Sequence, residues 1–183
     1  GLPLSEFDKI KNFCILVAQK RKLDINPDKE WYSAISELQK YRVSSAAYET
    51  AYISELYASF YNDSVSRENV HDSFVQKYRS LLTKRDPSLQ SSFVAFISQW
   101  TDYARAFGII ASRNRDAIVG RSITKGARSW LTRLDHMNLP TITRPLLTAA
   151  FLYWKKRDFE KIARAAEIYT FRSEEHTSEL QSH

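Results

Sequence analysis

Apolar residues in this chain recur at intervals of three and four, and this spacing constrains the fold more than any other feature. The pattern is clearest in Phe93, Phe96, Ile97, Trp100, Tyr103 and Phe107. Such spacing places apolar side chains on one face of an α-helix. Only four glycines and five prolines occur in 183 residues, so little interrupts the helices. No useful length of sequence alternates as a β-strand would, and the sequence therefore predicts an all-α fold.

Start signals divide the helical pattern into elements. Asn26-Pro27 and Asp86-Pro87 each pair a capping side chain with a proline suited to the first helical turn. Ser44 or Ser45 is expected to begin a third helix, and Asp158 to cap the last. The residues after Asp86-Pro87 are expected to form one long helix. We predict an irregular bundle of about seven to eight helices in a single domain over residues 1–171.

The composition is basic, with 27 Lys and Arg against 21 Asp and Glu. A basic balance favours nucleic acid, anionic membranes or acidic proteins as partners, although a soluble basic domain without such a partner fits equally well. Cys14 is the single cysteine, so an internal disulfide is excluded and a cytoplasmic setting is expected. No apolar run approaches the ~20 residues that span a bilayer, so no membrane partner is expected.

One basic segment stands above the background. Its cations are Arg113, Arg115, Arg121, Lys125, Arg128 and Arg133. Serine, threonine and asparagine lie between them, and guanidinium forks with hydroxyl groups suit phosphate contacts. The segment lacks the exposed aromatic residues expected for stacking on single-stranded bases. Nucleic-acid binding and a solvated basic loop both remain open for these residues.

The apolar pattern resumes after this segment at Trp130, Leu131, Leu134 and Met137. A second basic group, Lys155, Lys156 and Arg157, follows Trp154. We expect this group to lie at a helix C-terminus, where the helix dipole favours cations, and therefore to be structural.

Recognisable catalytic motifs are missing from the sequence. It contains no HExxH, CxxC, GxGxxG or phosphate-loop glycine cluster. His71 and His136 lie far apart and have no cysteine or paired carboxylates at ligand spacing, so both are expected to be structural. The sequence thus predicts no catalytic residue, no metal ligand and no cofactor.

The last twelve residues, RSEEHTSELQSH, resemble the in-frame translation of a common short-read sequencing adapter. The resemblance implies that residues 172–183 are non-native and that the gene was cut short near Phe171. A genuine polar tail is the alternative. Without these residues the chain has 26 Lys and Arg against 18 Asp and Glu, because the tail holds one arginine and three glutamates.

Several segments resemble the central helical region of the GmrSD-type restriction endonuclease family. The segments are EWYSAISELQKYRVSSAAYETAYISELYASFYND, RENVHDSFVQKYRSLL, SSFVAFISQWTDYARAFGII, RPLLTAAFLYW and FEKIARAAEIYTFR. They follow one another in the family's order over about residues 30–171. The closing segment resembles a pattern of Ile, Glu, Tyr and Arg, although the adapter would also encode Arg172.

This resemblance implies a bacterial defence protein that restricts modified DNA. Members carry a ParB-like domain with a DGQQR-type motif and many end in an HNH nuclease domain, and neither motif occurs here. NTP and a divalent metal would be used elsewhere in the parent protein. The chain is therefore expected to be a DNA-facing helical segment that contacts other domains of its parent and does not cut DNA alone. The alternative is a helical interaction or scaffold module with an incidental basic surface.

Overall fold

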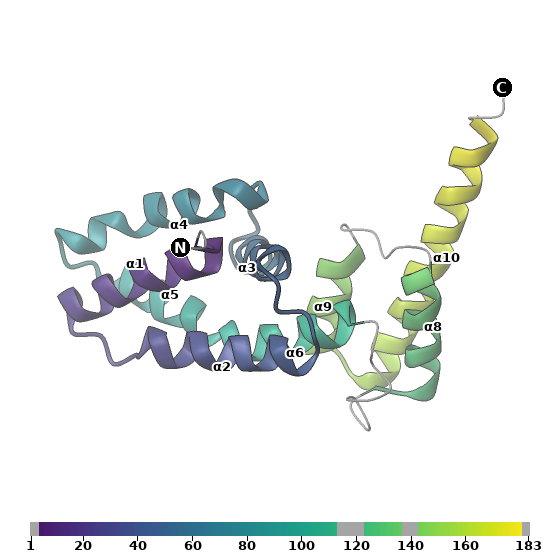
Figure 1. The fold of residues 1–183 in the computed structure, drawn as a ribbon, viewed down its shortest axis with the longest axis horizontal. Coiled ribbons are helices and arrows are strands. Elements are labelled where there is room, and N and C mark those ends of the chain that lie inside the picture. The colour runs from purple at the N-terminus through teal and green to yellow at the C-terminus, as the bar shows by residue number, and fades with distance from the viewer. Residues whose placement is uncertain (1–3, 113–122, 137–142, 181–183) are drawn as a thin grey trace. The chain divides into compact units, whose positions relative to one another are not determined.

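A computed structural model describes residues 4–112, 123–136 and 143–180 (Figure 1). These residues are largely helical and contain no strand, so the all-α prediction is confirmed. The chain divides into two compact units, Gly1–Gly108 (unit 1) and Ile109–His183 (unit 2). The prediction of one domain over residues 1–171 stays a prediction.

Unit 1 contains six α-helices among its described residues, the last of which continues past Gly108. They are α1 (Glu6–Arg21), α2 (Pro27–Lys40), α3 (Ala46–Tyr61), α4 (Val70–Tyr78), α5 (Pro87–Ser98) and α6 (Trp100–Ala111). Short 3-10 helices at Arg67–Asn69 and Arg79–Leu82 flank α4. The predicted caps are confirmed, because the side chains of Asn26, Ser45 and Asp86 each accept a backbone N–H from the first turn of their helix.

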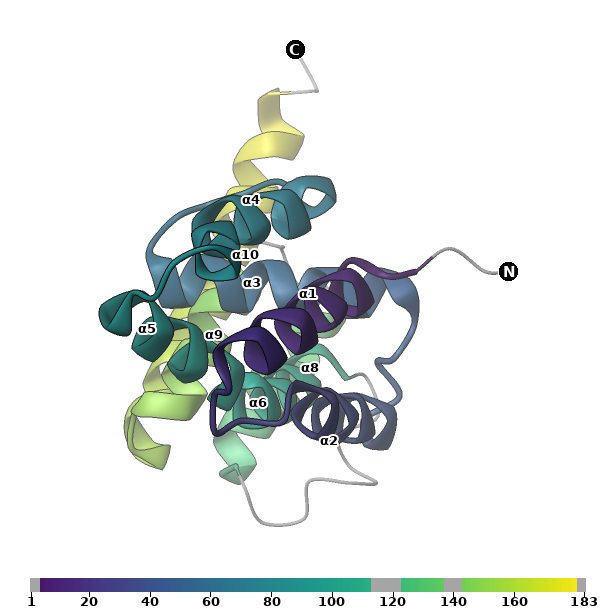
Figure 2. The ribbon, with the colours of Figure 1, turned by 90° about the vertical axis from the view of Figure 1, so that its left-hand side faces the viewer.

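Aromatic side chains fill the core of unit 1. Helix α1 lies between α4 and α2 in both views of the ribbon (Figures 1 and 2). From α1, the Phe7 ring meets the Tyr52 and Trp100 rings edge-on at centroid distances of 5.1 and 4.9 Å. Phe74 of α4 lies 5.1 Å from Phe96 of α5. All five side chains are fully buried, so the apolar faces predicted from spacing meet in one core.

The long helix predicted after Pro87 is divided at Gln99. The Gln99 N–H bonds to the carbonyl of Phe96 three residues back, which tightens the last turn of α5 before α6 begins. The Tyr52 hydroxyl, from α3, donates a 2.7 Å hydrogen bond to the Trp100 carbonyl. The prediction of one helix was wrong, and apolar spacing does not reveal the contact that Tyr52 makes next to the junction.

Unit 2 is described as three helices: α8 (Lys125–His136), α9 (Thr143–Tyr153) and α10 (Lys156–Leu180). Helix α10 packs against both α8 and α9. The predicted cap of α10 was wrong. The helix begins two residues before Asp158, because the Lys155 carbonyl already accepts the N–H groups of Asp158 and Phe159 at 2.9 and 3.0 Å.

Candidate functional site

The six cations predicted to bind nucleic acid fall into two sets. Arg113, Arg115 and Arg121 lie outside the described residues. Lys125, Arg128 and Arg133 all belong to α8. Lys125 and Arg133 are exposed, whereas Arg128 is half-buried. Because Arg128 is half-buried, Lys125 and Arg133 are the two of these three residues that offer exposed cations.

Arg133 takes part in a contact between α8 and α10. Its guanidinium lies over the Trp130 ring at 4.8 Å and 3.9 Å from the Glu167 carboxylate of α10. The guanidinium of Arg164, also on α10, lies 5.6 Å from the same ring. Trp130, at which the apolar pattern of the sequence resumes, is half-buried. Cation–π attraction and the carboxylate offset the repulsion between the two arginines and hold the helices together.

The start of α8 is joined to the first turns of α10. The Thr124 hydroxyl accepts the Ala127 N–H at 3.0 Å, as an N-cap does, and donates to the Glu160 carboxylate. Gly126 permits this approach, because a Cβ at that position would collide with the Glu160 carboxylate. A carboxylate near the first turn also complements the helix dipole. Lys125 is consequently held near the beginning of α10.

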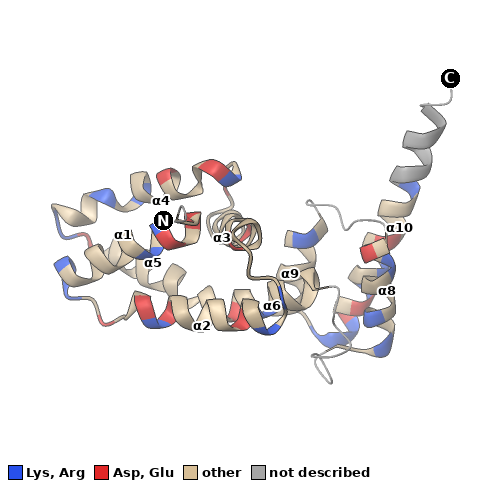
Figure 3. Ribbon diagram, viewed as in Figure 1, with Lys and Arg blue, Asp and Glu red and all other residues tan. Residues whose placement is uncertain are grey.

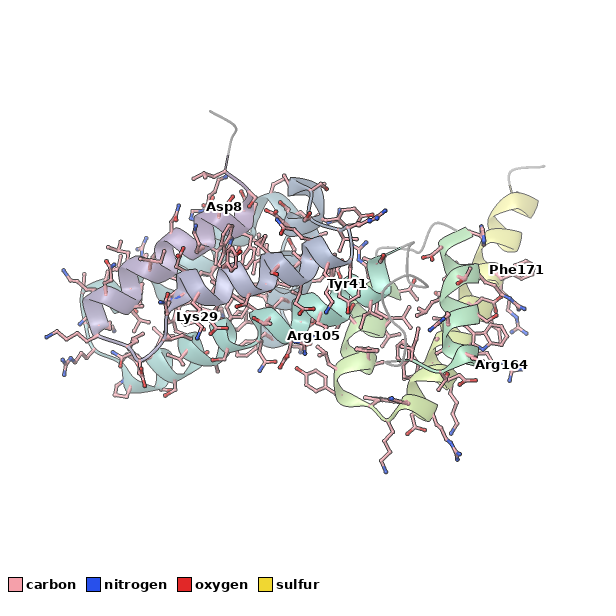
Figure 4. All side chains as sticks on the ribbon, turned by 60° about the horizontal axis from the view of Figure 1, so that its bottom comes forward. Asp8, Lys29, Tyr41, Arg105, Arg164 and Phe171 are labelled. Carbon is pink, nitrogen blue, oxygen red and sulfur yellow. The ribbon has the colours of Figure 1, made fainter. Side chains whose placement is uncertain are left out.

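A row of cations along α10 was not predicted from the sequence. Arg157, Lys161 and Arg164 are all exposed and stand at positions i, i+4 and i+7, which share one face of a helix. We call these three residues the α10 basic stripe. Arg164 marks its far end, about two turns before Phe171 on the same helix (Figure 4). The spacing of these three cations in the sequence is a signal that could have located the stripe, because positions i, i+4 and i+7 share a helix face.

The turn between α9 and α10 exposes five consecutive residues, Tyr153 to Arg157, which we call the tip. Tyr153 and Trp154 are 71% and 57% exposed. The prediction that the three cations lie at a helix C-terminus was wrong, because Lys156 and Arg157 begin α10. The dipole of α10 disfavours cations there, so the dipole argument for a structural role fails. Lys155 occupies the cap position, and its side chain has no acceptor atom for the first backbone N–H groups.

The net positive charge of the chain is concentrated in unit 2. Unit 1 has 14 Lys and Arg against 13 Asp and Glu. Unit 2 has 13 Lys and Arg against eight Asp and Glu, or 12 against five without residues 172–183. Lys and Arg occur on α8, at the beginning of α9 and on α10 (Figure 3). Unit 2 therefore carries nearly all of the excess positive charge.

The described residues offer little for metal or acid–base chemistry. No group of three His, Cys, Asp or Glu side chains among them is placed to hold a metal ion. His71 pairs with its neighbour Asp72, with 2.9 Å between Nδ1 and Oδ1. Cys14 is fully buried, and burial raises the pKa of its thiol. Within the described ranges, no helix has the length and apolar character needed to cross a membrane.

The chain was compared with known protein families, curated proteins and solved structures. No protein-family model, curated protein or solved structure matches the chain.

Proposed function

We propose that unit 2 binds the phosphate backbone of DNA, as a DNA-facing segment of a GmrSD-like, modification-dependent restriction protein in the bacterial cytoplasm. The α10 basic stripe and Lys125 are the described contacts, and Arg113, Arg115 and Arg121 precede Lys125 in the chain. No catalytic role is assigned to any of them. Catalysis, NTP and a divalent metal would belong to other parts of the parent.

The observation that carries the proposal is the contrast in charge between the units. A solvated surface of no particular function needs no excess of one sign, as the near balance of unit 1 illustrates. Residues 109–171 instead have more than twice as many cations as anions. Three of the cations lie on one exposed helix face, where they can contact successive phosphates of one polyanion.

Three acidic residues of α10 leave the α10 basic stripe positive. Glu160 is turned toward Thr124, and Glu167 lies beside Arg133 with only 15% of its side chain exposed. Asp158 pairs with Lys161 at 3.3 Å, so Lys161 would exchange this exposed pair for a phosphate. Exposed ion pairs are weak, and the exchange costs little.

Fluorescence anisotropy of labelled duplex DNA, titrated with the whole chain over a range of salt, tests the proposal. Log affinity should fall linearly with log salt, with a slope of about −0.9 for each phosphate neutralised. Replacing Arg157, Lys161 and Arg164 together by glutamine should weaken binding and flatten the slope. The matched control replaces three exposed cations of unit 1, Lys20, Lys84 and Arg85, and lowers the net charge equally.

The outcomes separate a site from a general charge effect. Weaker binding in the unit 2 variant alone supports a site, whereas equal losses in both variants point to net charge. Failure of the unaltered chain to bind duplex DNA at low salt contradicts the proposal. Reversing Arg113, Arg115, Arg121 and Arg128 to glutamate then asks whether the segment before α8 adds contacts. Helical circular dichroism of each variant confirms folding.

An interaction or scaffold function is the second candidate, favoured by exposed apolar residues on α10. Ile168, Tyr169 and Phe171 are 39%, 73% and 52% exposed. Other domains of the parent protein are the expected partners. The test is co-purification of the chain with the other domains of the parent protein. If this surface is an interface, Phe171→Asp should lower the yield of the co-purified domains. An unchanged yield would contradict the interface.

A further inference from the structure

The tip combines exposed aromatic residues with cations, whereas the basic segment predicted from the sequence has cations without exposed aromatic residues. Its two aromatic rings are exposed, and three cations follow them directly in the chain. Trp154 lies between the end of α9 and the beginning of α10, where the backbone holds it at the turn of a helical hairpin. Exposed aromatic side chains beside cations are how proteins hold the bases and the backbone of single-stranded nucleic acid.

We infer that the tip stacks on unpaired bases, so that unit 2 prefers single-stranded DNA or the end of a single strand over continuous duplex. The inference rests on the proposed function, because it assumes that the cations contact phosphates. In continuous duplex the faces of the bases are covered by their neighbours, and a ring at a protruding turn cannot reach them. An unpaired base exposes its face, and Trp154 offers the larger ring to cover it.

The α10 basic stripe offers a path along which a bound single strand of DNA could continue beyond the tip. Arg157 belongs to both features, and Lys161 and Arg164 continue along the same helix face. A rise of 1.5 Å per residue makes the stripe about 10 Å long from its first Cα to its last. A base held at Trp154 would therefore leave the following backbone to run beside these cations.

This geometry favours a strand-shaped polyanion over a membrane surface. Anionic lipid headgroups would also attract a tryptophan beside three cations. A flat surface that meets the tip would reach the end of the hairpin, whereas the cations of the stripe continue along its side. A single strand can contact both regions at once, and we commit to it on this ground.

Binding of the whole chain to two labelled oligonucleotides tests the inference. One is a deoxythymidine strand, and the other is an abasic strand of equal length with the same phosphates and no bases. The unaltered chain should bind the thymidine strand about fivefold more tightly or better, the effect expected for one stacked base. Trp154→Ala should remove that difference and leave binding to the abasic strand unchanged. Trp154→Phe, which keeps a ring, should retain much of it.

Tyr32→Ala is the matched control, because Tyr32 is 70% exposed in unit 1 and lies outside the proposed site. It should leave both affinities unchanged. Equal binding of both strands by the unaltered chain overturns the stacking inference but not the proposed function. Binding to neither strand at low salt removes both. A third arm uses vesicles containing phosphatidylserine, and a Trp154→Ala loss confined to vesicles would assign the tip to membranes and overturn the inference.

Discussion

The two units use aromatic residues in opposite ways. Unit 1 contains 17 aromatic residues, and Tyr32 is the only one of them that is exposed. Unit 2 contains seven, of which Tyr153, Trp154, Tyr169 and Phe171 are exposed. Unit 1 therefore buries nearly all of its aromatic side chains in a core. Exposed aromatic side chains do not gain the free energy of burial, and Tyr153 and Trp154 are followed directly in the chain by three exposed cations.

The same contrast holds for charge. The near balance of unit 1 includes ion pairs between neighbouring elements, such as Lys11 with Asp28 and Arg105 with Glu37. In unit 2 the cations outnumber the carboxylates, and the Trp130 ring lies beneath two guanidiniums, of which Arg164 also belongs to the α10 basic stripe. The following substitutions test which residues each unit depends on for stability.

Trp100→Ala should have the largest effect on stability. The side chain is fully buried against Phe7 and Phe96, and truncating such a residue costs about 3–5 kcal/mol. Trp154→Ala, in the exposed tip, should change the free energy of unfolding by less than about 0.5 kcal/mol. Urea unfolding monitored by circular dichroism measures both. Similar losses in the two variants would end the contrast between a core tryptophan and a surface tryptophan.

Gly108→Ala should destabilise unit 1 by about 1–3 kcal/mol, as overpacking does. A Cβ at Gly108 would collide with the Tyr41 ring and also approach the Tyr41 Cβ at 3.0 Å, so the obstacle includes atoms beside the backbone. Gly126→Ala in unit 2 meets only the flexible end of Glu160. The better helix propensity of alanine, up to about 1 kcal/mol, should offset that contact. Thermal unfolding of the two variants measures the difference. Equal decreases in melting temperature would show that both sites are equally rigid.

Alkaline pH should destabilise unit 1 through its tyrosines. Burial raises the pKa of Tyr52 well above its ordinary value, and burial also raises the pKa of Tyr61 and Tyr78. In the unfolded chain these hydroxyls ionise near pH 10. Their contribution to stability is thus fully present below about pH 10 and is lost as the pH rises above it, because only the unfolded state releases the protons.

Two spectra taken together measure this effect. The tyrosinate absorbance of Tyr52, Tyr61 and Tyr78 should rise together with the loss of helical circular dichroism. Tyr52→Phe should cost about 1 kcal/mol at neutral pH by removing the hydrogen bond to the Trp100 carbonyl, and it should flatten the alkaline decline. Full ionisation with the helices intact would contradict the buried placement.

Deletion of residues 172–183 should have the smallest effect on stability. Helix α10 continues through this segment to Leu180, yet Leu180 is its single apolar residue, so the segment should add little packing. The free energy of unfolding should change by less than about 0.5 kcal/mol. DNA binding at low salt should become tighter, because the deletion removes one arginine and three glutamates. A clear drop in melting temperature would show that the segment packs and would contradict the adapter interpretation.

Local signals in the sequence were enough to predict the helical class and the beginnings of α2, α3 and α5 in unit 1. Asn26, Ser45 and Asp86 cap the helices they were predicted to cap, because capping depends on one side chain and a backbone N–H three residues away. Apolar spacing also placed Trp100 in the core. These are local relations, and they can be read without knowing which helices pack together.

Only the tertiary structure decided the rest. The Tyr52 hydroxyl, which bonds to the Trp100 carbonyl next to the division at Gln99, lies 48 residues from Trp100 in the sequence. The beginning of α8 lies beside α10 because the Glu160 carboxylate contacts Thr124. Arg164 lies over the Trp130 ring because α10 packs against α8. Each outcome depends on which helices meet, and the periodicity of a single helix carries no record of its neighbours.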